Sequence, residues 1–595
     1  MPPESPYGFY SKTFDAALGV RPRDANHYNV GLVVKNRFDS VARRWTEVPA
    51  LPPHEALANE LVLRPSYLAE FDEMKAAGDL PDLYSQNPIV RAHPGERILP
   101  LCIFFDGVSF ARSDSCLAIW VYFLFSPIKH LVGVLRKSEF CSCGCAGWDS
   151  IRPMWECLKW SLLACQAGEY PSGRHDGRPW QESDSLRRPL AGQSLGFKAV
   201  PLFLKGDWAE WSVSLALPTW ASRVAPCPIC FVEPGQMSDA EELSPLGCPH
   251  KLKSIASYEI ACQQCEITRT FTSEQLSHLC DNLIYERSRD SCHGRGLARD
   301  MPEFNLRRGD RVEATAAIPD VGAIDEMVGP VTISFWRRVH ETSARRRFPL
   351  FGHALNLGPE NIGIDWLHTF SLGVASTWVS MAVWDLINAN VFSLAVARAD
   401  HISMSFSRIA GLLGDWIAKE KKEGRHHTAP QKFQSSMFGT NANRKCGLHG
   451  AETNSFVRFL GSVLDVYSDR IANGIEHVDA CASLIIIMDI IHDHSRKVPV
   501  AQRTRFCKAV QVLLVSFRRI GAPERPKEHL MIDMAGRLGT HGSPALVACW
   551  DDESRNFPLK RLCEDAHRSV WHARVLSGWA ARSDHLSTAK RVRRN

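Results

Sequence analysis

The sequence has no apolar run long enough to cross a lipid bilayer. A spanning helix needs about 18 or more consecutive apolar residues, whereas the best candidate, Cys116–Phe125, is soon followed by Pro127, Lys129 and His130. The N-terminal stretch MPPESPYGFYSKTFDAALGV also lacks the basic start and apolar centre of a secretory signal and the arginine-rich bias of a transit peptide. These absences predict a soluble protein that works inside the cell, without contact with a membrane.

The chain has little net charge and no internal repeat. A formal net charge of +5 over 595 residues does not by itself predict an acidic partner, and the lack of a repeat argues against a solenoid or a propeller. Basic residues gather in RRVHETSARRRF and in the terminal KRVRRN, although a solvated surface is the ordinary explanation for such runs. With 45% hydrophobic residues, a chain of this length is expected to form roughly three or four globular domains.

Nineteen cysteines are present, but their pattern does not predict a disulfide framework. The number is odd, and several cysteines are spaced as C-x-C or C-x-x-C, which in a large intracellular protein indicates metal ligands or free thiols. Two C-x-x-C pairs, in APCPIC and ACQQC, are predicted to supply the four thiolate ligands of one tetrahedral Zn²⁺ site: Cys227, Cys230, Cys262 and Cys265. Such a closed site would be structural, because it leaves no open position for chemistry.

A second group of residues is predicted to take part in zinc binding. Cys248 and His250 lie between the two C-x-x-C pairs and are candidates either to replace one ligand or to build another site. The motif CSCGC supplies three further thiols: Cys141, Cys143 and Cys145. Its fourth ligand is not evident, although His175 is a candidate, and the alternative is a tight turn with free thiols.

Apolar, β-branched and aromatic runs predict a mixed sheet in the first half of the chain. Three of them follow one another closely and predict a three-stranded meander: Ile98–Phe105, Cys116–Phe125 and Ile128–Leu135. The segment DSIRPMWECLKWSLLAC then has the apolar spacing of a helix, and FKAVPLFL predicts a fourth strand. A fifth strand is predicted at Asn361–Trp366, and helical periodicity dominates from Ser371 onward. The predicted fold class is α/β.

Two of these apolar strands end on an acid. Asp106 follows LCIFF, and Asp207 follows the run VPLFL after a short Lys-Gly link. An ionised carboxylate is costly to bury without a partner, so each acid is expected to face solvent, to be paired, or to bind a cation. The simple alternative is a turn, because Asp-Gly and Gly-Asp are common turn sequences. If the two strands are neighbours, the acids converge, and Mg²⁺ (or Mn²⁺) is the expected ligand.

A two-metal site needs one more carboxylate, and three positions compete for this role. Glu452 ranks first, because it would continue the buried face of the helix in HGAETNSFVRFLGSVLDVY; the alternative is that it complements the helix N-terminus. Asp365 ranks second, since Asp365 and His368 would share a helix face, although Asp365 is also a good N-cap. The acids Asp551–Glu553 rank third, with a helix cap as their simple explanation.

Several stretches, taken in order, resemble one family of proteins. They are PLCIFFDGVSF, VGVLRKSEFCSCGCAGW, FLKGDWAEW, LRRGDRVEATAAIPDVG, FWRRVHETSARRRFPLFGHALNLGPENIGIDWLHTFSLGV, HGAETNSFVRF and RPKEHLMIDMAGRLGTHGSPALVACWDDESRN. Together they are similar to the Kyakuja-Dileera-Zisupton and Plavaka group of DDE transposase-derived proteins, which recur in protist genomes. The resemblance spans residues 100–576, and the order of the motifs is its specific part.

This resemblance implies a ribonuclease-H-like fold with the element order β-β-β-α-β-α-β-α and with the first and fourth strands adjacent. A large helical insertion before the last acid is also a feature of DDE transposases of the hAT type. The implied organisation is 1–95 N-terminal extension, 96–225 first part of the core, 226–300 cysteine-rich insertion, 301–370 connector and fifth strand, 371–445 helical insertion, and 446–595 closing helix and helical C-terminal region.

The resemblance also implies the chemistry. Asp106, Asp207 and Glu452 would hold two Mg²⁺ (or Mn²⁺) ions for the cleavage and transfer of DNA strands. The implied partner is DNA, in the form of transposon ends, and the implied location is the nucleus. A homo-oligomer is compatible with this activity, and the chain is either an active enzyme or a degenerate or domesticated copy of one.

Two other functions stay open on the sequence alone. One is a catalytically inactive zinc- and DNA-binding protein of transposon origin. The other is a ribonuclease-H-like nuclease that acts on RNA or on hybrids and recognises the 2′-hydroxyl. Convergence of three carboxylates within about 4–8 Å, the span of a two-metal site, is the geometric condition for either enzyme.

Overall fold

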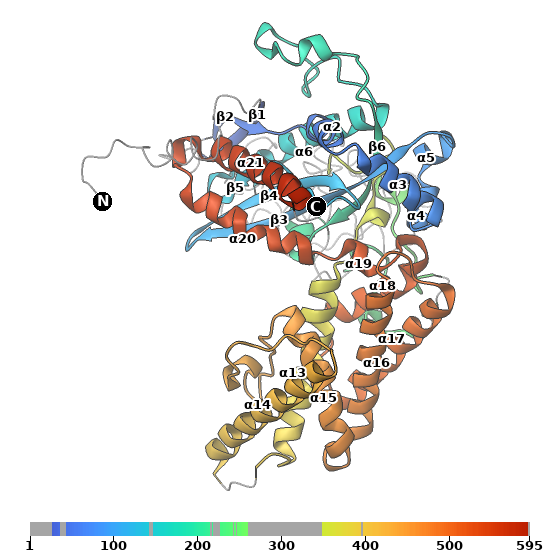
Figure 1. The fold of residues 1–595 in the computed structure, drawn as a ribbon, viewed down its shortest axis with the longest axis vertical. Coiled ribbons are helices and arrows are strands. Elements are labelled where there is room, and N and C mark those ends of the chain that lie inside the picture. Colours follow the sequence, from blue (N-terminus) through green and yellow to red (C-terminus); the bar gives the residue numbers. More distant parts are fainter. Residues whose placement is uncertain are drawn as a thin grey trace, which may run out of the picture.

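The computed structural model describes residues 27–35, 43–141, 147–214, 217, 226–241, 243–244, 247–259, 348–393 and 397–592. In this part of the chain, a sheet covered by helices lies at one end of the molecule, and a body of long helices extends away from it (Figure 1).

Four strands form the central sheet, in the spatial order β5-β4-β3-β6. They are β3 (Ile98–Ala111), β4 (Asp114–Phe123), β5 (His130–Arg136) and β6 (Lys198–Lys205). β3 pairs antiparallel with β4 and parallel with β6, and β4 pairs antiparallel with β5. Most of their residues are buried, because both faces of the sheet are covered, and this explains why the strands are continuous apolar runs. The predicted meander and the adjacency of the first and fourth strands are confirmed.

A short segment extends the sheet beyond β6. Ile362 forms a parallel bridge with Leu204, and the Gly363 N–H donates to the Leu204 carbonyl at 2.8 Å. The Asn361 side-chain amide donates to the Leu202 carbonyl at 3.1 Å. The fifth strand predicted at 361–366 is therefore a single bridge rather than a regular strand, but it brings this segment to the expected edge of the sheet.

The helix α6 (Trp148–Ala167) connects β5 to β6 across one face of the sheet. Its buried residues recur at helical spacing and include Ile151, Trp155, Leu158 and Leu162. The Trp155 ring packs edge-on against Phe105 of β3, with 5.5 Å between the ring centroids. The helix predicted from DSIRPMWECLKWSLLAC is therefore confirmed, and it packs on the sheet.

The N-terminal extension contributes to the same hydrophobic core. It contains an antiparallel hairpin of β1 (Tyr28–Lys35) and β2 (Arg43–Ala50), and β1 packs against α6. Alternate residues of β1 are buried, as expected for a strand with one covered face. Four helices follow: α2 (Pro53–Leu63), α3 (Ser66–Ala77), α4 (Asp82–Gln86) and α5 (Pro88–Ala92). The hairpin was not predicted from the sequence, because the extension is rich in proline and mixed charge.

Helices dominate the second half of the chain, as predicted. The π-helix η6 (Leu367–Ala375) continues directly into α13 (Ser376–Asn388). Together, as Leu367–Asn388, they are long and apolar enough to cross a membrane, but 83% of the most apolar window is buried inside the fold. The long helices that follow are α14 (Arg398–Lys422), α15 (Gly450–Tyr467), α16 (Gly474–Asp493), α17 (Val500–Ile520) and α18 (Pro526–His541).

The last helices return from the helical body to the sheet (Figure 1). After α19 (Pro544–Val547), α20 (Trp550–Asp565) packs on β3, and α21 (Trp571–Val592) packs on β5 and β2. The Trp579 indole of α21 donates to the Lys129 carbonyl at 2.9 Å. The shorter helices are η1 (Lys137–Glu139), η2 (Glu182–Asp184), η3 (Arg188–Leu190), α7 (Trp208–Ser214), η4 (Pro234–Gln236), η5 (Pro359–Asn361), η7 (Ser435–Phe438), η8 (Ser468–Arg470) and η9 (Arg568–Val570).

Candidate carboxylate site and candidate metal centre

Acids lie near the same edge of three adjacent parallel segments. The prediction that the first strand ends at Asp106 is wrong, because β3 continues to Ala111 and Asp106 pairs with Ala118 of β4. In the register of β3 and β6, Phe104 is opposite Lys205, so the chain brings Asp106 and Asp207 to the same edge of the sheet. Asp365 follows the segment that bridges to β6 through Ile362. The carboxyl ends of parallel strands are the usual position of functional sites in α/β proteins. This edge is therefore the candidate functional site.

Helix α20 supplies a fourth acid and an amide to this edge. The Asn556 side-chain amide donates to Asp106 Oδ2 at 2.6 Å and to Glu553 Oε2 at 2.8 Å, so one amide links the two carboxylates. The other oxygen of Asp106, Oδ1, accepts from the Gly107 N–H at 2.7 Å. Glu553 and Asn556 are three residues apart and therefore share one face of α20. The structure thus brings Glu553, the lowest-ranked candidate for the third acid, to Asp106.

The carboxylates of this site disfavour one another's ionisation. Burial, followed by the charges of Glu553 and Asp207, raises the pKa of Asp106 to about 7. Burial also raises the pKa of Glu553, and the charges of Asp365 and Asp207 act in the same direction. Clustered carboxylates at a protein surface edge relieve this repulsion by holding a proton or a hard divalent cation. Asp106, Asp207 and Glu553 are therefore neighbours whose charges act on one another.

Asp207 also has a structural role, as a cap of α7, whereas the alternative expected for it was a turn. Its Oδ1 accepts from the Glu210 N–H at 2.7 Å, which satisfies a free donor in the first turn of α7. The Glu210 carboxylate in turn pairs with Lys137, at 2.7 Å between Nζ and Oε1. Capping fixes the direction of the Asp207 side chain relative to the sheet edge.

Asp365 is buried and is held mainly by His368. Its Oδ2 lies 2.6 Å from the His368 Nδ1, and its Oδ1 accepts from the Cys549 N–H at 2.7 Å. Burial alone would raise the pKa of Asp365, but the hydrogen bond and charge of His368 lower it overall. Burial opposes the charge on His368, but Asp365, Glu553 and Asp207 together raise the pKa of His368. Asp365 thus orients His368 toward the carboxylate site and connects the sheet edge to the start of α20.

Glu452 has a defined structural role at the start of α15. Its Oε2 accepts from the His449 N–H at 2.8 Å, across the first turn of the helix. This is the N-terminal arrangement that was the alternative for Glu452 in the sequence. Its assignment as the third acid stays a prediction.

A buried ion cluster fixes α20 on the sheet directly beside the carboxylates. Asp552 is fully buried and accepts from the Tyr122 hydroxyl at 2.9 Å and from the ammonium groups of Lys205 and Lys129. Lys205 Nζ also donates to the Ala548 carbonyl at 3.0 Å. Because Asp552 and Glu553 are consecutive, anchoring the first directs the second toward Asp106. The sequence predicts a helix cap for both acids. It does not indicate that Asp552 is buried against two lysines while Glu553 lies near Asp106.

A second cluster has the composition of a metal centre. The ligand atoms of four buried residues lie within 4.8 Å of one another: Cys227, Cys230, His529 and Asp533. Cys230 Sγ lies 3.1 Å from His529 Nε2, and Cys227 Sγ lies 3.0 Å from Asp533 Oδ2. His529 and Asp533 are four residues apart on α18 and therefore share a face. The cluster could hold a metal ion, and its thiol and imidazole donors suit zinc.

The charges of this cluster favour a bound cation. Burial raises the pKa of the Cys227 thiol, but the hydrogen bond from Cys230 and the charge of His529 lower it to about 7. Burial and the neighbouring Cys227 hold the pKa of Cys230 well above its usual range. One thiol of the pair thus keeps its proton beside the other. Metal binding would stabilise both thiols as thiolates.

The other predicted zinc ligands either lie outside the described residues or make contacts that are described next. Cys262, Cys265, Cys143 and Cys145 lie outside the described residues. Cys248 Sγ lies 2.9 Å from Asp533 Oδ1, at the border of the cluster, and the His250 ring lies 5.5 Å from that of His529. Cys141 is buried, and its N–H donates to the Ser150 hydroxyl at 2.8 Å. His175 Nδ1 is 2.7 Å from the Tyr28 hydroxyl.

Sequence reasoning did not find His529 and Asp533. The available signal was the spacing H-x-x-x-D on an amphipathic helix, which places an imidazole and a carboxylate on one face. That spacing is common, and these residues lie about 300 positions from the cysteines. Only the packing of α18 against the cysteine segment selects them.

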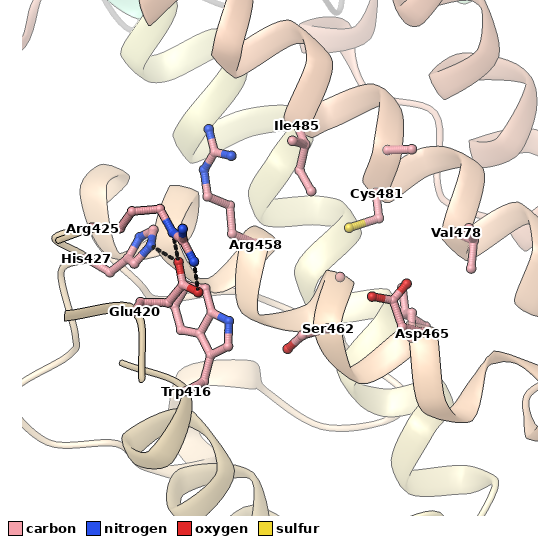
Figure 2. A pocket seen from close by; sticks show the side chains of 13 residues that line it. Trp416, Glu420, Arg425, His427, Arg458, Ser462, Asp465, Val478, Cys481 and Ile485 are labelled. Atoms are coloured by element: carbon pink, nitrogen blue, oxygen red, sulfur yellow. Dashed lines mark hydrogen bonds and ion pairs between the residues drawn. The ribbon is translucent and has the colours of Figure 1, made fainter. Parts of the chain in front are cut away.

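A separate hollow lies in the helical body, between α14, α15 and α16 (Figure 2). Its volume is about 410 Å³, and it is lined by both acidic and basic side chains. The charged groups satisfy one another: Arg425 Nε donates to Glu420 Oε2 at 2.5 Å, and His427 Nε2 lies 3.2 Å from the same oxygen. Glu420, Arg425 and His427 thus neutralise one another at one side of this hollow.

No protein-family model matches the chain, and a search of curated proteins found no match. The function is therefore argued from the geometry of the two sites.

Proposed function

We propose that this protein cleaves and joins DNA strands by two-metal phosphodiester chemistry at Asp106, Asp207 and Glu553. The observation that carries the proposal is that Asp106, Asp207 and Glu553 lie near the same edge of the sheet, where burial and neighbouring carboxylates raise the pKa values of Asp106 and Glu553. Active sites are where such shifts concentrate. The proposal departs from the sequence prediction in taking Glu553 instead of Glu452 as the third acid.

The proposed fold is ribonuclease-H-like. It is supported by three antiparallel strands, a crossover helix, and a fourth strand that lies parallel to the first. The bridge from Ile362 to Leu204 adds a further parallel segment at the same edge. In the proposed organisation, the helices α13 and α14 lie within the insertion of residues 371–445 that precedes the last acid.

The residues of the site have separate roles in the proposed reaction. Bound Mg²⁺ would polarise the phosphodiester and lower the pKa of the attacking water. Asp106, Asp207 and Glu553 would hold the ions, while Asn556 fixes the distance between two of these carboxylates. In hydrolysis, a water oxygen bonds to phosphorus, the bond to the 3′-oxygen or 5′-oxygen breaks, and the water proton passes to solvent or a base. In strand transfer, a DNA 3′-hydroxyl takes the place of that water.

His368 is the proposed proton acceptor at this edge. Its Nδ1 contacts Asp365, so its Nε2 is the free ring nitrogen for exchange with a water or a leaving oxygen. Asp365 keeps the ring in one orientation, in the way that a buried carboxylate orients a catalytic histidine. The proposed partner is DNA and the proposed location is the nucleus, in line with this substrate.

Metal-dependent nicking of a labelled DNA duplex tests the proposal. The purified chain is incubated with Mg²⁺ or Mn²⁺, alongside Asp106→Asn, Asp207→Asn and Glu553→Gln. Each variant is expected to lose roughly 1,000-fold or more in rate, since each removes several kcal/mol of metal-dependent stabilisation. Glu564→Gln is the matched control, because it changes an exposed glutamate of the same helix.

The variant Glu452→Gln decides the third acid in the same experiment. Loss of nicking in Glu553→Gln with retention in Glu452→Gln supports Glu553, and the reverse result supports Glu452. A wild-type chain that never nicks DNA in either metal would refute the enzymatic proposal. Efficient cleavage of RNA–DNA hybrids but not of duplex DNA would support the ribonuclease instead.

We also propose that the cluster of Cys227, Cys230, His529 and Asp533 binds a structural zinc ion. The support is the burial of all four donors and their mutual distances. A closed set of four ligands leaves no open position, so the ion would fasten α18 to the cysteine segment instead of taking part in the reaction. A zinc- and DNA-binding protein without turnover is the second candidate function, and this cluster is the observation that favours it.

A further inference from the structure

Backbone pairing holds Cys248 beside the proposed zinc ligands. The segment that follows Cys248 pairs antiparallel with the segment that contains the C-x-x-C pair. The Phe231 N–H donates to the Lys251 carbonyl at 2.9 Å, and the Lys253 N–H donates to the Ile229 carbonyl at 2.8 Å. Both cysteine turns also begin with the same dipeptide, Cys-Pro, in CPIC and in CPH. The fold therefore places the two turns side by side.

Helix α18 holds the Cys248 turn from the other side. A Cβ atom on Gly536 would lie only 2.5 Å from the Cys248 Cα, so the turn packs this closely on the helix only because the residue is glycine. Glycine is unfavourable inside a helix, and this close approach is a physical reason for its presence. Gly536 lies on the same face of α18 as His529 and Asp533. The Cys248 backbone therefore packs on the helix face that carries two donors of the metal cluster.

The Asp533 carboxylate connects the Cys248 thiol to this cluster. Asp533 Oδ1 accepts from Cys248 Sγ at 2.9 Å, and Oδ2 accepts from Cys227 Sγ at 3.0 Å. The same Oδ2 lies 3.1 Å from His529 Nε2. His529 Nδ1 lies 3.2 Å from the Met237 carbonyl, which leaves Nε2 as the ring nitrogen for a metal. One carboxylate thus gathers two thiols and an imidazole around itself.

A second partner is in place for Asp533 once a metal has bound. Thiols lose their protons when they bind zinc, so the carboxylate would lose two donors and face two negative sulfurs. Arg537 lies one turn further along α18 and is only 3% exposed. Among the described residues, its Nε and Nη1 have no hydrogen-bond partner, although buried N–H groups are normally satisfied. Asp533 can therefore turn from the thiolates to this guanidinium group.

We propose that Cys248 is a ligand of the zinc ion. The ion is then held by three thiolates and the His529 imidazole, and the Asp533 carboxylate lies beside it and pairs with Arg537. Zinc favours thiolate over carboxylate in structural sites, where three cysteines and one histidine are a common ligand set. This inference rests on the proposed zinc site and changes its fourth ligand from an oxygen to a sulfur.

X-ray absorption at the zinc edge of the purified full chain tests this inference. A Zn–S bond is about 2.3 Å long and a bond to nitrogen or oxygen about 2.0–2.2 Å, so the spectrum counts the sulfur ligands. The wild type is expected to have three Zn–S bonds, and Cys248→Ser is expected to have two. The zinc affinity of Cys248→Ser, measured by competition with a chelating dye, should fall by more than about 100-fold, beyond the loss caused by removing a residue that only supports a ligand.

Two further variants complete the experiment. Cys446→Ser is the matched control, because it removes another partly exposed cysteine, outside the metal cluster, and should keep three Zn–S bonds. Cys248→His keeps a donor at the same position, so it is expected to stay loaded with zinc and to have two Zn–S bonds. Circular dichroism and thermal melting establish that each variant is folded.

The outcomes separate this inference from the proposed zinc site. Two Zn–S bonds in the wild type, unchanged in Cys248→Ser, overturn the role of Cys248 and leave the zinc site intact. Three or more bonds that persist in Cys248→Ser and Cys248→His also overturn it, because another cysteine then supplies the sulfur. Loss of all zinc from both folded variants, with three bonds in the wild type, supports it. A wild-type chain that binds no zinc overturns both proposals.

Discussion

Two consecutive acids of α20 have opposite surroundings. Asp552 is fully buried against two lysines and a tyrosine, whereas Glu553 faces Asp106 and Asp207. Lys205 and Lys129 therefore neutralise only the first acid. At the scale of single residues, the functional assignment depends on this difference in burial and partners between Asp552 and Glu553. The sequence WDDESRN does not indicate that difference.

The titration of Asp106 gives a prediction for stability against pH. Its folded-state pKa of about 7 is above the ordinary value of 3.8, so the folded chain binds a proton that the unfolded chain releases in this window. The free energy of unfolding of the metal-free protein should therefore fall as the pH rises from about 4 to 7. Asp106→Asn should remove this loss, which amounts to roughly 2–4 kcal/mol.

Thermal or urea unfolding in EDTA at several pH values measures this effect. Mg²⁺ should restore the stability of the wild type at pH 8 and leave Asp106→Asn unchanged. Asp415→Asn, an exposed aspartate on α14, is the control. An identical pH dependence in wild type and Asp106→Asn would contradict the assignment of a raised pKa to Asp106.

The ion cluster around Asp552 gives a second residue-scale prediction. Asp552→Asn would leave the ammonium groups of Lys205 and Lys129 buried without their shared carboxylate. Breaking a buried pair in this way costs about 3–5 kcal/mol, measured as a shift in urea unfolding. Asp551→Asn, whose carboxylate is 62% exposed and also contacts Lys129, should cost less than about 1 kcal/mol. Equal losses in the two variants would refute the central role of Asp552.

At the scale of elements, α18 connects the two candidate sites. Its first turn carries Lys527, which donates to the Leu372 carbonyl of η6, and the following turns carry His529 and Asp533 in the metal cluster. Further along, Arg537 donates to the Glu360 carbonyl, next to the bridging segment at Ile362. A metal that fastens α18 would therefore also hold Lys527 and the edge of the sheet in register.

Metal content tests this arrangement. His529→Ala should lose one equivalent of zinc relative to wild type, measured by elemental analysis, because three donors hold the ion much more weakly than four. Its melting temperature should fall by several degrees, since the binding free energy contributes to folding. His492→Ala, which removes a histidine that is 87% exposed, should keep both values. Unchanged zinc content in His529→Ala would exclude this ligand set.

At the scale of the whole molecule, residues far apart in the sequence pack into one hydrophobic core. The N-terminal hairpin packs on α6, and α21 packs on β5 and β2 (Figure 1). Tyr28, Tyr67 and Trp571 are each almost completely buried, and each comes from one of these terminal regions. The extension is therefore structural support for the sheet that carries Asp106.

Deletion of residues 1–95 tests this role. The shortened chain would expose the apolar face of α6 that β1 covers and should be aggregated or melt at least about 10 °C lower. Analytical size exclusion and differential scanning fluorimetry measure the result. A deletion variant that is monodisperse and melts like the full chain would show that the extension folds independently of the sheet.

Sequence reasoning succeeded where the information is local. The apolar runs of β3, β4, β5 and β6 and the period of α6 were all visible, because burial on a strand or a helix face repeats within a few residues. Asp207 follows β6, as expected, whereas Asp106 lies inside β3, which continues to Ala111. The hairpin β1–β2 was missed because it lies in a stretch rich in proline and mixed charge, and the fifth strand proved to be only a bridge at Ile362.

The sequence by itself determined the α/β class, the acid that follows β6, and the cysteine pair suited to a metal. Only the tertiary structure decided that Glu553 approaches Asp106 and that His529 and Asp533 meet Cys227. The physical reason is that periodicity reports which face of an element is buried but not which distant element covers it. That choice depends on the packing of whole helices, and α18 and α20 follow the helices of the helical body in the chain.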